Sequence, residues 1–122
     1  MSERGSVSIL VVAALAALLV ISMGAADVVR VLATAARAQT AADAAALAAA
    51  QTMAIPGPDE EPAELARTYA AHNAGALQSC ECEPESFEAI VTVSMPVGPL
   101  FLVADDRAVT ATARAIVDLP AP

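Results

Sequence analysis

Apolar residues fill the first fifth of the chain almost without interruption. Residues 5–26 carry no charge, and residues 7–23 consist almost wholly of Val, Ile, Leu and Ala. About 20 such residues cross a hydrocarbon layer of about 30 Å, and a single span can satisfy its backbone hydrogen bonds there only as a helix. The pattern therefore predicts a transmembrane helix over residues 7–26, preceded by a tail of residues 1–6.

The alanine-rich stretch that follows prolongs this helix. Residues 27–51 contain only good or neutral helix formers, and the first helix breakers are Pro56, Gly57 and Pro58. At 1.5 Å per residue, a helix from residue 7 to residue 51 is about 65–70 Å long, so more than half of it stands clear of a bilayer. We expect residues 27–54 to continue the helix outside the membrane and residues 55–62, rich in Pro and acids, to form a linker.

A small head domain, residues 63–122, is expected to begin with a second helix. Pro62 suits its first position, and residues 73–75 (Asn-Ala-Gly) supply a stop. One face of this helix is formed by Leu65, Ala66, Tyr69, Ala70 and Asn73.

Beyond Gly75 the period of the pattern becomes that of strands. Residues 87–95 and 109–119 each alternate an apolar or small residue with a more polar one. We expect these two strands to pair antiparallel and to lay their Ala and Val faces on the long helix, because a two-stranded ribbon is marginal by itself. Residues 100–103, between them, fit either a short strand or an apolar turn near the membrane. The predicted fold class is α+β.

Composition and charge narrow the possible functions. The chain has 122 residues, fourteen acids and six bases, all of them Arg, for a net charge of −8. Such a surface repels phosphate backbones, so no nucleic-acid partner is expected. His72 has no Ser or Cys at a spacing typical of a nucleophile, and no glycine-rich phosphate loop is present. We therefore expect no enzymatic activity, no cofactor and no small-molecule substrate.

Cys80 and Cys82 form the chain's one thiol pair, and several states stay open for it. A disulfide suits an oxidising compartment, although a bond between positions two apart closes a small, strained ring. A bridge to another molecule and free thiols are alternatives. A metal site has the least support, since two thiols and the distant His72 do not complete a tetrahedral set.

Asp43 is a conspicuous charge in the second half of the long helix. Helical steps back from Leu47 place it on a stripe with Thr40, Ala36, Leu32 and Val29, the stripe expected to pack. A packed acid needs a partner, and Arg114 or Arg67 could provide one as a clamp between helix and head. The alternative is a solvated carboxylate at the edge of the stripe.

Small residues also mark one side of the apolar segment. Ala13, Ala17 and Gly24 fall near one face, where another helix could approach closely. The alternative is that these residues face lipid.

Several of these residues carry a resemblance to a known family. Residues 3–6 (Glu-Arg-Gly-Ser) before an apolar helix, and residues 37–50 (Arg-Ala-Gln-Thr-Ala-Ala-Asp-Ala-Ala-Ala-Leu-Ala-Ala-Ala), resemble the N-terminal segment of TadE/TadG-like, pseudopilin-like proteins of the Tad (Flp) pilus and secretion system. The short length, residues 73–75 followed by Cys80, the Val-rich strand and the closing Ala/Arg-rich strand are similar to short TadE-like proteins of actinobacterial pilus or secretion loci.

The resemblance implies a pilin-like fold and a non-catalytic minor pseudopilin or pilus-assembly component. It would be held in the cell membrane by a single pass, with its C-terminal domain extracytoplasmic and other pilus or secretion subunits as partners. Processing in this wider class cuts after a glycine and looks for a glutamate five residues on, which makes Gly5 the candidate processing site. The fifth residue after Gly5 is Leu10 instead, which favours a stable anchor over a processed filament subunit.

A different class of function follows if residues 1–26 are a cleaved secretory signal, with a cut near Ala26. The product would be a small secreted acidic protein that binds a cationic ligand or partner. The length of the apolar run exceeds the usual signal core of about 7–15 residues, which favours the anchor. The Lys/Arg bias does not decide topology, because Arg4 lies on one side of the segment and Arg30 and Arg37 on the other.

Overall fold

The computed structural model describes residues 3–55, 57 and 60–121. Residues 1–2 of the predicted tail, and residues 56 and 58–59 of the predicted linker, lie outside this part. Within the described residues, two helices, one short 3₁₀ turn and three strands follow one another: α1 (Glu3–Ala54), α2 (Pro62–His72), β1 (Ala76–Glu81), the turn Pro84–Ser86, β2 (Glu88–Pro96) and β3 (Ala108–Ile116). The predicted α+β fold class is confirmed.

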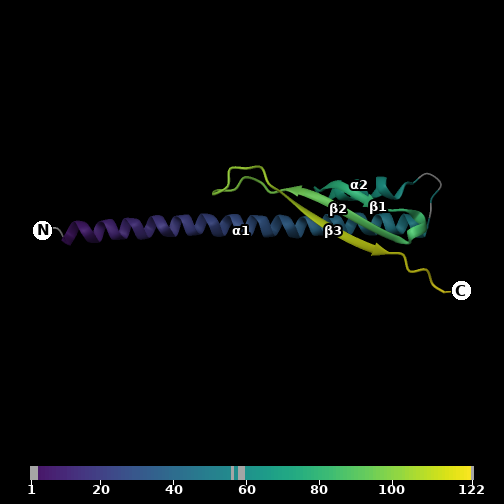
Figure 1. The fold of residues 1–122 in the computed structure, drawn as a ribbon, viewed down its shortest axis with the longest axis horizontal. Coiled ribbons are helices and arrows are strands. Elements are labelled where there is room, and N and C mark those ends of the chain that lie inside the picture. Colours follow the sequence, from purple (N-terminus) through teal and green to yellow (C-terminus); the bar gives the residue numbers. More distant parts are fainter. Residues whose placement is uncertain (1–2, 56, 58–59, 122) are drawn as a thin grey trace.

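Helix α1 is a rod of 52 residues, and the sheet and α2 cover only its C-terminal part (Figure 1). In the first part, the large apolar side chains from Val7 to Met23 are each between 42% and 73% exposed. The helix Gly5–Ala54 is long and apolar enough to cross a membrane, with a mean hydropathy of 2.7 over its most apolar window and none of that window buried. From Ala38 onward, one face of α1 packs against the head and is buried by it.

The head is a three-stranded antiparallel sheet in the order β1-β2-β3, with α2 beside it on α1. The central strand β2 buries Ala89, Val91, Val93 and Met95 and alternates them with more exposed residues, as the pattern predicts. The predicted pairing of the two long strands is also confirmed, with Val91 opposite Ala113 of β3.

Two details of the sheet differ from the sequence-based expectation. The strand predicted from residue 87 begins one residue later, at Glu88: Phe87 precedes β2 with a φ of 54° and is 47% exposed. Strand β1 was not predicted, because its sequence, ALQSCE, has no apolar alternation. It lies at the edge of the sheet, and its pairing with β2 places it there.

The face of α1 that packs is not the predicted stripe. The stripe residues Val29, Leu32, Ala36, Thr40, Asp43 and Leu47 are all exposed. At 100° per residue, the buried face lies on the opposite side of the helix; it consists mainly of Ala38, Ala41, Ala42, Ala45, Ala46, Ala49 and Met53. The sheet packs on the side where methyl groups let the backbones approach closely, and the stripe with the bulkier side chains stays outside.

The turn after α2 illustrates this close approach. Helix α2 buries Ala66 and Ala70 from its predicted face, while Tyr69 and Asn73 of that face stay exposed. Its end is a Schellman motif, in which the amide of Gly75 donates to Ala70 O at 2.9 Å and that of Ala74 to Ala71 O at 3.0 Å. Ala74, with a φ of 60°, occupies the left-handed position. Gly75 serves packing instead, because an added Cβ would lie 2.4 Å from Val93 Cγ1.

Candidate functional site

The loop between β2 and β3 reaches back along α1 toward the N-terminus. A hydrogen bond of 2.8 Å from the Val97 amide to the Arg107 carbonyl closes its base. Beyond this base the two arms of the loop run past the end of the sheet and lie beside the middle of α1 (Figure 1). We call residues 99–103 the loop tip, and the contact of the loop tip with α1 the loop dock.

Asp27 of α1 holds the loop tip by its backbone. Its Oδ1 accepts a hydrogen bond from the Phe101 amide and its Oδ2 one from the Leu102 amide, each 2.8 Å long. The aspartate is 7% exposed, so both carboxylate oxygens are satisfied where little water reaches them. Hydrogen bonds to an ionised acceptor are shorter and about twice as strong as those between neutral groups. This carboxylate therefore fixes where the loop tip lies along α1.

Arg30, one helical turn further on, contacts the same loop tip. Its Nη1 donates to the carbonyl oxygen of Pro99, and its guanidinium carbon lies 4.8 Å from the centroid of the Phe101 ring. The second contact is a cation–π interaction, which contributes about 0.5–1 kcal/mol at an exposed position. Spacing of three residues puts both charges on neighbouring positions of α1, so one helix turn supplies both an acceptor and a donor to the loop.

Gly24 completes the loop dock. A Cβ added at this position would lie 3.3 Å from Leu102 Cδ1, so the glycine leaves room for the leucine. Of the predicted small-residue strip, Gly24 is thus under the loop, whereas Ala13 and Ala17 are exposed. Packing of another helix on Ala13 and Ala17 stays a prediction.

Sequence reasoning missed the loop dock. The sequence pattern marks Asp27 only as the first residue after the uncharged run, and Arg30 only as one of the bases beside that run. The available signal was an acid at the first charged position after the segment, since a carboxylate so close to hydrocarbon needs a partner. That partner is a pair of backbone amides some 75 residues away, which no side-chain pattern reveals.

The residues of the predicted clamp have other partners. Arg114 pairs with Glu88 on the neighbouring strand, and Arg67 pairs with Glu64 within α2. Asp43 is exposed and accepts a hydrogen bond of 2.9 Å from Gln39 Nε2, which also lies 3.4 Å from the Thr112 carbonyl oxygen of β3. The predicted clamp is therefore corrected: Gln39, not an arginine, links Asp43 to β3, and Arg67 and Arg114 pair with acids nearer to them.

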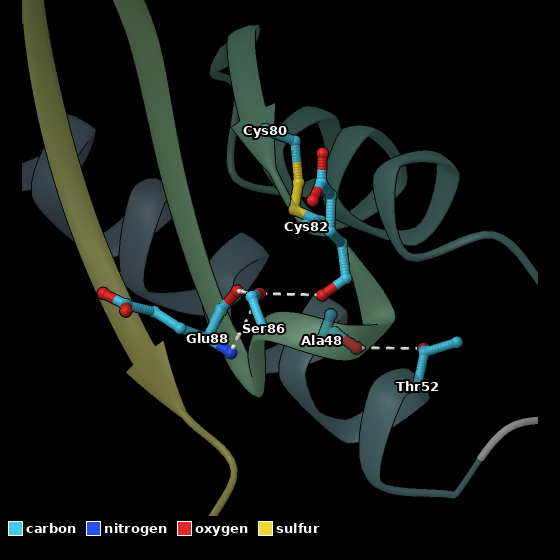
Figure 2. The surroundings of a disulfide bond; sticks show 7 residues. Ala48, Thr52, Cys80, Cys82, Ser86 and Glu88 are labelled. Carbon is cyan, nitrogen blue, oxygen red and sulfur yellow. Dashed lines mark hydrogen bonds between the residues drawn. A yellow bond between two sulfur atoms is a disulfide. The ribbon is translucent and has the colours of Figure 1, made fainter.

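Cys80 and Cys82 are joined by a disulfide at the end of β1 (Figure 2). The bond lies near Ser86, whose hydroxyl donates to Glu83 O at 2.7 Å and holds the turn between β1 and β2. Glu81 and Glu83 flank the disulfide and are exposed, so water solvates their charges and no bound ligand is needed to account for them. His72 is exposed in the last turn of α2, with its ring centroid 6.0 Å from that of Tyr69, and Gly5 lies in the open first turns of α1.

Comparison with known proteins adds one finding. Residues 5–52 match the Tad family model, which is described as putative Flp pilus-assembly TadE/G-like. No curated protein and no solved structure matches the chain. The Tad match covers nearly all of α1, including Asp27, Arg30 and the alanine face, and stops before the head. The long helix is therefore similar to that of Tad-type pilus-assembly proteins, which supports a pilus component over a catalyst.

Proposed function

We propose that this protein is a minor pseudopilin or assembly component of a Tad (Flp)-type pilus or secretion system, anchored in the membrane by α1 and without catalytic activity. The observation that carries the proposal is the coincidence of two features in one helix. Residues 5–52 match the Tad family model, and the apolar part of the same helix is uncovered. We further propose kinship with short TadE-like proteins of actinobacterial loci, on the likeness of layout in the head.

The anchor rests on the apolar surface of α1. Side chains such as Leu10, Leu15 and Leu19 are 70%, 56% and 65% exposed and form one continuous apolar surface around the helix. Water-soluble proteins rarely leave such a surface uncovered. A bilayer covers it fully, and the uncharged length suits a single pass.

The topology proposed is a short N-terminal segment inside and the head outside the cytoplasm. The Cys80–Cys82 bond supports this orientation, because disulfides persist in oxidising compartments. Cleavage near Ala26, the alternative of a secreted binding protein, would detach Gly24 from Leu102 and leave Asp27 at a frayed new terminus. The loop dock thus favours an uncut anchor. Because Leu10 replaces the expected acid, we also propose that Gly5 remains uncut.

The partners proposed are helices of other pilus or secretion subunits. The exposed stripe on α1, defined above from Val29 to Leu47, has spacings of three and four residues, as helix-packing seams do. Leu32 and Leu47 are 64% and 56% exposed on it. The head occupies the opposite side of α1, so it leaves the stripe free for a neighbour.

The N-terminal residue and the location of the native protein test the anchor. We expect the chain to sediment with the membrane fraction of the native envelope and to keep its residues before Asp27. A soluble chain that begins near Asp27 would contradict the anchor and establish the secreted alternative. A membrane-bound chain that begins at Ser6 would keep the anchor but show that Gly5 is cut.

Site-specific photo-crosslinking tests the partners. A photoreactive phenylalanine analogue in place of Leu32 should crosslink the protein to another subunit of the pilus system in the native envelope. The matched control is the same analogue at Leu119, which is 53% exposed but lies outside α1. Equal crosslinking at both positions, or none at Leu32, would contradict a role for the stripe.

A further inference from the structure

The loop tip exposes two large apolar side chains although its backbone is hydrogen-bonded to α1. Phe101 and Leu102 are 55% and 53% exposed. Their amides are the two that Asp27 binds, so the side chains do not project from a loosely held segment. A fixed apolar surface of this kind marks a contact with a partner or a membrane.

The level of the loop tip along α1 identifies that contact. Leu102 lies against Gly24, which belongs to the uncharged segment and precedes Asp27 by three residues. At 1.5 Å per residue, Gly24 is about 4.5 Å closer to the centre of that segment than Asp27. A bilayer spanned by residues 7–26 would therefore have Leu102 just inside the edge of its hydrocarbon and Phe101 at the headgroup level.

The charged groups at this level are hydrogen-bonded within the protein. Asp27 accepts hydrogen bonds from two backbone amides, and Arg30 donates to the Pro99 carbonyl and lies over the Phe101 ring. A charged group without polar partners is costly at the edge of the hydrocarbon, and these contacts lower that cost. Asp105, Asp106 and Arg107 are exposed on the returning arm, nearer the base of the loop. Their position allows the loop tip to enter the bilayer to a shallow depth, whereas deeper insertion would bring these charges into the hydrocarbon.

From these observations we propose that the loop tip is a lipid-contacting wedge, which seats the head on the surface of the bilayer beside α1. The inference rests on the proposed membrane anchor. The occupant is lipid rather than a second copy of the chain, because the loop tip continues an apolar surface that surrounds α1 on every side. Two points of membrane contact, the helix and the wedge, restrict the rotation and tilt of the head. The exposed stripe of α1 is thereby presented to neighbours in one orientation.

Tryptophan fluorescence of the full chain in lipid vesicles tests the wedge. The chain contains no Trp, so one introduced Trp reports on one site. The variants are Phe101→Trp at the loop tip, Leu15→Trp in the middle of the apolar segment, and Phe87→Trp as the matched control. Phe87 is an aromatic residue of similar exposure, 47%, at the opposite end of β2. The vesicles contain phosphatidylethanolamine and phosphatidylglycerol, with bromine atoms at either a shallow or a deep position of the acyl chains.

We expect Phe101→Trp to be blue-shifted and to lose more emission to shallow than to deep bromine, while Leu15→Trp shows the reverse order and Phe87→Trp is not quenched. Leu102→Trp repeats the measurement in case the first variant disturbs the Arg30 contact. If Leu15→Trp is quenched but both loop variants behave like Phe87→Trp, the wedge is refuted and the anchor stands. A blue shift that depends on protein concentration without bromine quenching would assign the loop tip to a second copy instead. If Leu15→Trp is not quenched, the anchor and the wedge both fail.

Discussion

Replacement of Asp27 by Ala should release the β2–β3 loop from α1 without unfolding the head. The carboxylate is the acceptor for the Phe101 and Leu102 amides, and Ala offers neither oxygen. The buried Ala and Val core lies further along α1, from Ala38 onward, and keeps its contacts. The loss is therefore local, and the loop should open into solvent as a unit.

The magnitude follows from the two bonds. A hydrogen bond to a charged group contributes about 1.5–3 kcal/mol, and because the freed amides can regain water we expect about 2–4 kcal/mol for the pair. Since 1.4 kcal/mol is a factor of ten, the equilibrium constant for loop opening should rise about 30- to 700-fold. Asp27→Asn should fall between wild type and Asp27→Ala, because the amide has one acceptor oxygen and its NH₂ group would face the second backbone N–H.

Amide hydrogen exchange of the full chain in detergent micelles or nanodiscs measures this change. Protection should be lost at Phe101 and Leu102 in Asp27→Ala, with protection of β2 retained. Asp43→Ala is the matched control, since it removes an exposed carboxylate of the same helix that accepts one bond, from Gln39. Unchanged protection of both loop amides in Asp27→Ala, or an equal loss in Asp43→Ala, would refute the role assigned to Asp27.

Three further predictions concern the head. Neighbouring substitutions after α2 should change the stability of the head in opposite directions. Ala74→Gly relieves a left-handed alanine and should raise stability by about 1 kcal/mol, whereas Gly75→Ala overpacks a closed site and should lower it by about 1–3 kcal/mol. Thermal unfolding followed by circular dichroism measures both changes, and changes of the same sign would contradict the roles assigned to Ala74 and Gly75. Ala45→Leu, at a position with 0% exposure, should also cost about 1–3 kcal/mol, while Ala36→Leu on the exposed stripe of α1 should leave the melting temperature nearly unchanged. For the Cys80–Cys82 disulfide, reductant should raise the intact mass by two hydrogen atoms and be required for alkylation; alkylation of the untreated protein would show free thiols.

Local pattern was sufficient for most of the secondary structure. A long uncharged run followed by an unbroken series of helix formers favours one continuous helix, and α1 follows. Pro62 and the residues after His72 bracket α2, and strict alternation marks β2 and β3. These features depend on neighbours within a few residues, so the sequence expresses them directly.

The packing face, strand β1 and the loop dock depended on tertiary structure. Along α1 the sequence offers a bulky stripe and an alanine face, and the sheet packs on the second because close backbone approach requires small side chains. Strand β1 exists because β2 has an unpaired edge, and nothing in its own residues specifies that. The role of Asp27 depends on amides far along the chain, whose position is known only once β2 and β3 have paired and carried their loop back to α1. Backbone groups carry no sequence signature, so contacts made through them appear only when the chain is folded.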